Sequence, residues 1–158
     1  MNRLQQSIDK CNFVENETPT DLAEQLREKL LSLQKSSNLS RDVSSIILES
    51  EAYAKLQNFI ANYKYIHESN KIWNELETAI IKSSPKFKTH LQLLTGGNLK
   101  AQDLHLALLI KCGVTPTQMT VLVGKAKGTI SYRREALCVR IFGRNLGAKV
   151  IDDIIRSL

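Results

Sequence analysis

Residues 99–142 decide how this chain is interpreted, and they read LKAQDLHLALLIKCGVTPTQMTVLVGKAKGTISYRREALCVRIF. The segment contains three groups of apolar residues at helical spacing, separated by breaks at Cys112-Gly113 and at Gly124. The three groups are Leu104, Leu108 and Leu109; Met119, Leu122 and Val123; and Ile130, Leu137 and Ile141. The pattern predicts three consecutive helices, the third beginning near Thr129.

The middle helix of this segment has clear signals at both of its ends. Thr115 is a favourable N-cap residue, and Pro116 suits the first helical position, where its missing N–H is not needed. Gly124 ends the helix, and residues 125–128 form a short turn before the next one. Two short helices joined by a glycine-containing turn, the second of them basic, are typical of a DNA-binding helix-turn-helix unit.

The distribution of charge favours a polyanionic partner. Residues 1–84 contain 10 Lys or Arg and 12 Asp or Glu, a net charge of −2; residues 85–158 contain 12 and 4, a net charge of +8, and the sum is +6. Between residues 111 and 149 the one acidic residue is Glu135, and the cations are Lys111, Lys125, Lys127, Arg133, Arg134, Arg140, Arg144 and Lys149. Such focusing is an electrostatic footprint for nucleic acid, although a solvated basic face would give the same composition.

Composition predicts an all-α protein. The 158 residues include 7 Gly and 3 Pro, and 42% are apolar, which is enough for a modest core. No apolar run approaches the roughly 20 residues that span a bilayer. The first residues also lack the apolar stretch of a signal peptide, so we expect a cytoplasmic protein.

No motif indicates catalysis or a bound cofactor. The three cysteines and three histidines lack disulfide or metal-ligand spacing, and no phosphate-binding loop follows a predicted strand. Asp152 and Asp153 are adjacent acids, but neighbours on a helix point about 100° apart, so we expect them on the solvent side of a last helix. We therefore expect neither enzymatic activity nor a metal, cofactor or small-molecule site.

The chain divides into three predicted regions. Residues 1–19 are polar and weakly periodic, residues 20–84 form a helical oligomerisation or linker region, and residues 85–158 form the DNA-binding domain. In the middle region one helix has apolar residues at heptad positions, namely Ala23, Leu26, Leu30 and Leu33. This helix is either the tail of a coiled coil or a helix that packs on its own domain. The predicted fold is thus an N-terminal helical dimerisation region followed by a helix-turn-helix domain.

Three further expectations concern the region before residue 84. Ser40 should cap a helix that turns Ile46 inward. Residues 50–66 should form a helix with Tyr63 on its apolar stripe. Trp73 could mark a ligand platform, but a single Trp at helical spacing is more often a core anchor, and we favour that interpretation.

Part of the sequence resembles a known family of regulators. The residues TISYR at 129–133, with Leu137 and Ile141 behind them, resemble the recognition helix of LuxR-type transcriptional regulators, and GVTPTQM at 113–119 resembles their turn into the scaffold helix. The segments LESEAYAKL and IWNELETAIIKSSPKFKTHL and the ending IDDIIRSL resemble the cytoplasmic C-terminal part of bacterial tetratricopeptide-repeat transmembrane regulators. The resemblance implies a transcriptional regulator, membrane-tethered in its full form, whose sensing part lies outside this chain.

The predicted DNA-binding residues fall into two groups. The helix at 129–140 would lie in the major groove of double-stranded DNA, with base edges read by Thr129, Ser131, Tyr132 and Arg133. Phosphates would be contacted by Lys125, Lys127, Arg134, Arg140, Arg144, Thr115 and Gln118. Regulators of this kind bind paired half-sites, so we expect a homodimer, with RNA polymerase as a further candidate partner.

Two other functions fit part of the pattern. A basic helix-turn-helix can act as a protein-interaction module that docks on the transcription machinery or on another regulator. RNA binding is less well supported, because stacking on single strands uses aromatic side chains and only Tyr132 lies near the basic cluster in sequence. Steep salt dependence with a preference for one duplex would distinguish DNA reading from a protein partner of fixed stoichiometry.

Overall fold

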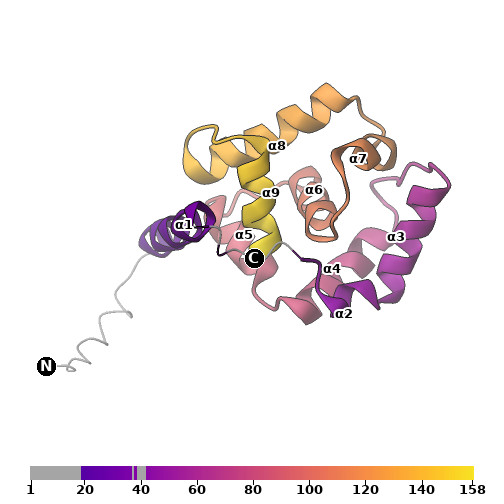
Figure 1. Cartoon of the computed structure of the whole chain (residues 1–158), viewed down its shortest axis with the longest axis horizontal. Coiled ribbons are helices and arrows are strands. Elements are labelled where there is room, and N and C mark those ends of the chain that lie inside the picture. The colour runs from indigo at the N-terminus through magenta and orange to yellow at the C-terminus, as the bar shows by residue number, and fades with distance from the viewer. Residues whose placement is uncertain (1–18, 37, 39–41) are drawn as a thin grey trace, which may run out of the picture.

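Helices are the regular elements in the part of the chain that the structure, a computed structural model, describes: residues 19–36, 38 and 42–158 (Figure 1). In these ranges the prediction of an all-α fold is confirmed. The helices are α1 (Pro19–Lys35), α2 (Ser45–Leu48), α3 (Glu51–Ala61), α4 (Ile72–Ser83), α5 (Phe87–Leu94), α6 (Ala101–Lys111), α7 (Pro116–Val123), α8 (Lys127–Phe142) and α9 (Ala148–Ser157). None of these helices is long and apolar enough to cross a membrane.

Helix α1 packs against its own chain. It lies on α5 and α9, where Ala23 and Leu30 are buried and Leu26 and Leu33 pack against the core. The apolar face that matches a heptad pattern is therefore covered within the molecule. Of the two alternatives for this helix, the structure agrees with packing on its own domain.

Helix α2 begins later than the sequence pattern predicts, and helix α3 ends earlier. Ser40 lies outside the described residues, and α2 is instead capped by Ser44, whose hydroxyl accepts a hydrogen bond from the N–H of Ile46. The side chain of Ile46 is 49% exposed, so the prediction that it points inward is wrong. Helix α3 ends at Ala61, and Tyr63, 81% exposed, does not belong to its apolar stripe.

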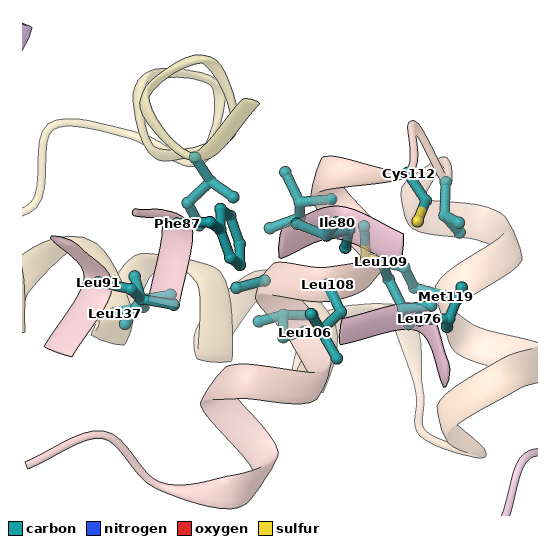
Figure 2. Packing of buried hydrophobic residues seen from close by; sticks show 14 of the residues in the cluster. Leu76, Ile80, Phe87, Leu91, Leu106, Leu108, Leu109, Cys112, Met119 and Leu137 are labelled. Atoms are coloured by element: carbon teal, nitrogen blue, oxygen red, sulfur yellow. The ribbon is translucent and has the colours of Figure 1, made fainter. Parts of the chain in front are cut away.

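One apolar core joins the regions that the sequence analysis separates at residue 84. Figure 2 shows Leu76 and Ile80 of α4 in the same cluster as Leu108 and Leu109 of α6. Helix α4 packs on α6, and α3 packs on α7. Trp73, 5% exposed, belongs to this cluster, which confirms its role as a core anchor. The N-terminal helices are thus part of the scaffold that holds α7 and α8.

Helix α6 is the central element of that scaffold. Every residue from 106 to 112 is buried, and the apolar side chains of this stretch face α4, α8 and α9. A helix that is apolar around most of its circumference is stable only when other helices surround it. Even Lys111 is buried, and its Nζ donates to the carbonyl oxygen of Arg156 in α9 at 2.7 Å.

Helix α9 closes the core from the C-terminal side. Its apolar residues Ile151, Ile154 and Ile155 are buried against α8, α6 and α1. Asp152 and Asp153 are buried as well, so the expectation that they lie on the solvent side is wrong. The physical reason is that α9 is enclosed on more than one side, and Asp152 has an arginine partner there.

Candidate nucleic-acid interface

Helices α7 and α8 are set at a fixed geometry by local signals that the sequence carries. Thr115 and Gln118 form a capping box at the start of α7: each side-chain oxygen accepts from the other residue's backbone N–H, at 3.2 and 3.0 Å. Gly124 ends α7 with φ 71° and ψ 35°, in the left-handed region. The connection to α8 is Gly124, Lys125 and Ala126, so α8 begins at Lys127, two residues before the predicted start.

The capping box gives Thr115 and Gln118 a structural role. The backbone N–H groups of both residues, which are the donors that the start of α7 would offer to a phosphate, are already engaged within the chain. We therefore remove both residues from the set of phosphate contacts. Their function is to start α7 at a defined residue, because capping satisfies backbone N–H groups that have no partner inside the helix.

Helix α8 has a buried face and an outward face. The buried face consists of Ile130, Arg134, Leu137, Cys138 and Ile141. On the outward face Thr129 is exposed and Tyr132 is 71% exposed. Ser131 and Arg133 lie between the two faces and are half-buried. The four predicted base-reading residues thus all have surface at the start of α8, with Thr129 and Tyr132 the most accessible.

Arg134 points into the protein. Its Nε donates to Oδ1 of Asp152 at 3.2 Å, and its Nη2 donates to Oδ2 of the same carboxylate. Both side chains are about nine-tenths buried, at 9% and 12% exposure. The prediction that Arg134 contacts a phosphate is therefore at odds with the structure, in which its guanidinium fastens α8 to α9.

Arg140 is also engaged inside the fold. It forms an ion pair with Asp103, in the first turn of α6, and donates to the carbonyl oxygen of Asn98. The Asp103 side chain is 8% exposed, so the arginine compensates a buried charge. We call Arg134 and Arg140 the paired arginines, and we remove both from the phosphate-contacting set.

Three other cations remain available around the start of α8. Lys125 and Lys127 are exposed, and together with Arg133 they make no ion pair or side-chain hydrogen bond with any described residue. We call Lys125, Lys127 and Arg133 the free cations. They surround the end of α8 that follows the turn, where a recognition helix contacts DNA.

Arg144 lies at the other end of α8. Figure 1 shows α8 extending from the turn after α7 across the molecule to the loop that leads into α9. Arg144 is in this loop and Lys149 is in the first turn of α9; both are exposed. A helix of 16 residues spans ~24 Å, so the predicted phosphate contacts do not form one cluster.

A cavity of about 190 Å³ lies beside the free cations. Lys125 and Arg133 line it, together with Tyr65, Glu68 and His105. The His105 ring stacks on Trp73, with ring centroids 4.1 Å apart and planes 4° from parallel. Burial lowers the pKa of His105 below its usual 6.5, although Glu68 and Glu77 oppose the shift. At neutral pH His105 therefore adds no charge, and the charged groups that line the cavity are Lys125, Arg133 and Glu68.

Cys112 and Cys138 are both buried. Burial raises the pKa of Cys112 to about 12, although the charge of Lys111 acts in the opposite direction. Cys138 is buried on the inner face of α8, where its sulfur accepts from the N–H of Leu146 at 3.4 Å. Both side chains pack in the apolar core.

One element of this surface, the connection between α3 and α4, is not predicted from the sequence. The N–H of Ile66 donates to the carbonyl oxygen of Leu122 in α7 at 2.8 Å. The Tyr65 ring lies against Gly124, where an added Cβ would come within 2.8 Å of the ring. The sequence signal is YKY at residues 63–65, but the apolar pattern predicts a helix through residue 66, and Tyr132 is the one aromatic residue that lies near the cations in sequence.

Comparison with family models, with characterised proteins and with solved structures finds no match to this chain. The inference of function therefore depends on the sequence pattern and on the geometry of the α7–α8 surface.

Proposed function

We propose that α7 and α8 form a helix-turn-helix and that the chain is a sequence-specific DNA-binding transcriptional regulator of the LuxR type. The start of α8 would enter the major groove of double-stranded DNA. The observation that carries this proposal is the position of the free cations. They surround the accessible start of α8, whereas the paired arginines further along it are engaged in the fold.

Direct reading of bases would depend on the outward face of α8. Thr129 and Tyr132 are accessible there, and Ser131 and Arg133 flank them. An arginine that pairs bidentately with a guanine contributes about 1–3 kcal/mol of discrimination against other bases. Arg133 is the residue of this group that can make such a pair, and its guanidinium has no competing partner among the described residues.

Contacts with the phosphate backbone of the DNA would come from Lys125 and Lys127. A lysine that neutralises a phosphate releases counterions, so it contributes affinity and salt dependence without base preference. Arg144 lies beyond the far end of α8, and we expect it to contribute less than either lysine.

The paired arginines support this function indirectly. The Arg134–Asp152 pair connects α8 to α9, and the Arg140–Asp103 pair connects α8 to α6. Side chains that read base edges must be held in position by rigid elements. The paired arginines are positioning residues, because they hold α8 in the orientation in which its start faces outward.

Binding as a homodimer, with RNA polymerase as a further partner, also belongs to this proposal. The apolar face of α1 is covered by α5 and α9 and so is not available to a second copy. Ile46 and Leu48 of α2 are 49% and 46% exposed. They are the large apolar side chains between residues 42 and 61 that remain accessible for association.

The test is selection of duplexes from a random pool at two salt concentrations, followed by sequencing. We expect the wild-type chain to enrich a motif that the Lys127→Ala/Arg133→Ala variant fails to enrich. The matched control is Lys29→Ala/Lys82→Ala, which removes two exposed charges from α1 and α4 and should leave the motif unchanged.

Weak binding without sequence preference, equal in all three proteins, would contradict the proposal. A protein-interaction module would then be the better account of the surface. It would be recognised by a complex of fixed stoichiometry that forms in the absence of nucleic acid.

A further inference from the structure

Residues Tyr63, Lys64 and Tyr65, here the 63–65 segment, present exposed aromatic and basic side chains next to α7. Tyr63 is 81% exposed, Tyr65 is 50% exposed, and Lys64 is also exposed. Exposed large side chains of this kind cover little of the protein's own core. Tyr65 lines the cavity that Lys125 and Arg133 share, which raises the question of an external partner for the segment.

Hydrogen bonds hold the backbone of the segment in place, although its side chains are exposed. The next residue, Ile66, is 1% exposed, and its N–H donates to the carbonyl oxygen of Leu122. The N–H groups of Tyr63 and Lys64 donate to the carbonyl oxygens of Ile60 and Phe59, at 3.2 and 2.9 Å. These two bonds form the double-bonded ending of α3 known as the Schellman motif.

Tyr63 has an unfavourable backbone conformation in this motif. Its φ is +53°, and it is the one non-glycine residue with positive φ in the part of the chain that the structure describes. At the end of α6 the equivalent position is Gly113, with φ +78°. A left-handed conformation is costly for a residue with a Cβ, and the ring of Tyr63, at 81% exposure, gains little packing in return. Strain of this kind at an exposed residue indicates a function for its side chain.

The 63–65 segment is continuous with the proposed DNA-binding surface. The Tyr65 ring lies on Gly124, the first residue of the turn into α8. Tyr65 also lines the cavity that Lys125 and Arg133 share. Glu68 is the one carboxylate on the cavity lining, so cations outnumber anions there even without Lys64.

We propose that the 63–65 segment is a second DNA contact, which binds the phosphodiester backbone next to the groove occupied by α8. Lys64 would neutralise a phosphate, and the Tyr63 and Tyr65 hydroxyls would donate hydrogen bonds to phosphate oxygens. The Tyr65 ring, seated on Gly124, fixes the distance between this contact and the start of α8. This inference rests on the proposed function and extends the interface from one helix to two separate elements of the chain.

The test compares stability with affinity for the duplex enriched by the wild-type chain. Tyr63→Gly should raise Tm by roughly 2–4 °C, because glycine adopts the left-handed conformation without strain. The same variant should weaken DNA binding by about 3- to 10-fold, the value of one hydrogen bond. Tyr63→Phe is the matched control: it keeps the ring and the strain, so Tm should not change while affinity still falls.

The variant Lys64→Ala tests for a phosphate contact through the salt dependence of DNA binding. We expect the slope of log K against log salt to decrease by about 1, the change for one phosphate contact. Lys82→Ala, a remote exposed lysine on α4, should leave the slope unchanged. The inference would be overturned by two results together. Tyr63→Gly would gain stability and lose no affinity for DNA, and Lys64→Ala would leave the slope of log K against log salt unchanged.

The two proposals fail in different ways. If Lys127→Ala/Arg133→Ala loses binding while the variants in the 63–65 segment bind like wild type, the proposed function stands and this inference is wrong. If the wild-type chain shows no salt-dependent binding to duplex DNA, both are wrong.

Discussion

Arg133 and Arg134 are neighbours in sequence, and the structure uses them in opposite ways. Arg134 is buried in an ion pair with Asp152 of α9. Arg133 lines the cavity at the surface and makes no ion pair with any described residue. The same contrast separates the paired arginines from the free cations. The net charge of a helix therefore does not measure the charge that the helix offers to a partner.

The contrast predicts different consequences for removing each kind of cation. Loss of a paired arginine leaves an uncompensated carboxylate in the protein, so the effect is on folding. Loss of a free cation leaves nothing unpaired, so the effect is on binding.

The largest effect is expected for Arg134→Ala. Removal of one partner from a buried ion pair costs about 3–5 kcal/mol, because the other charge remains buried without compensation. Urea unfolding followed by circular dichroism measures this loss. The double variant Arg134→Met/Asp152→Leu, which removes both charges and keeps apolar volume, should recover most of the stability. Equal stability of Arg134→Ala and wild type would show that the ion pair with Asp152 is not needed to hold α8 on α9.

Arg140→Ala should have a smaller effect of the same kind. Asp103 loses its ion pair, but it stays in the first turn of α6, where the helix dipole favours a negative charge. We expect a loss of about 2 kcal/mol of unfolding free energy, measured in the same way. Asp103→Asn in the Arg140→Ala background should restore part of it, since the buried charge is then absent.

The pH dependence of stability should follow His105, which lines the cavity of the free cations. Its pKa is lowered in the folded chain, mainly by burial, so below pH 6.5 the unfolded chain takes up a proton that the folded chain does not. Stability is therefore full above this pH and declines as the pH falls through it. His90 acts with the same sign, since burial and then Lys86 and Lys29 lower its pKa.

The measurement is urea unfolding between about pH 7.5 and 5.5, a range that brackets the ordinary histidine pKa. His105→Gln should show a weaker decline than wild type over this range. A decline of unchanged size would show that His105 is not the group responsible.

The smallest effect on folding is expected for Lys127→Ala. The side chain is exposed and has no partner among the described residues, so the unfolding free energy should stay within about 0.5 kcal/mol of wild type. A loss comparable to that of Arg140→Ala would mean that the free cations are structural after all.

Much of the α6–α9 region could be predicted from the sequence, because its signals are local. The N-cap at Thr115 and the break at Gly124 each act within one helical turn, and the apolar stripe of α8 repeats within one helix. The all-α class follows from the same signals, repeated along the chain.

The pairing of charges could not be predicted in this way. Arg134 meets Asp152 across 18 residues, and Arg140 meets Asp103 across 37, so their contacts depend on how the helices pack. The burial of Asp152 follows from the same packing. The 63–65 segment was missed for a related reason: its importance comes from contact with Gly124, about 60 residues further along the chain.

The most direct test of the central claim is the affinity of two matched variants for the enriched duplex. Lys127→Ala/Arg133→Ala and Arg144→Ala/Lys149→Ala each remove two cations that make no ion pair with any described residue, from opposite ends of α8. We predict a loss of at least ~10-fold for the first pair and a clearly smaller loss for the second, because in the proposed complex base contacts would add to phosphate contacts only at the start of α8. Equal losses, or a larger loss for Arg144→Ala/Lys149→Ala, would contradict the account.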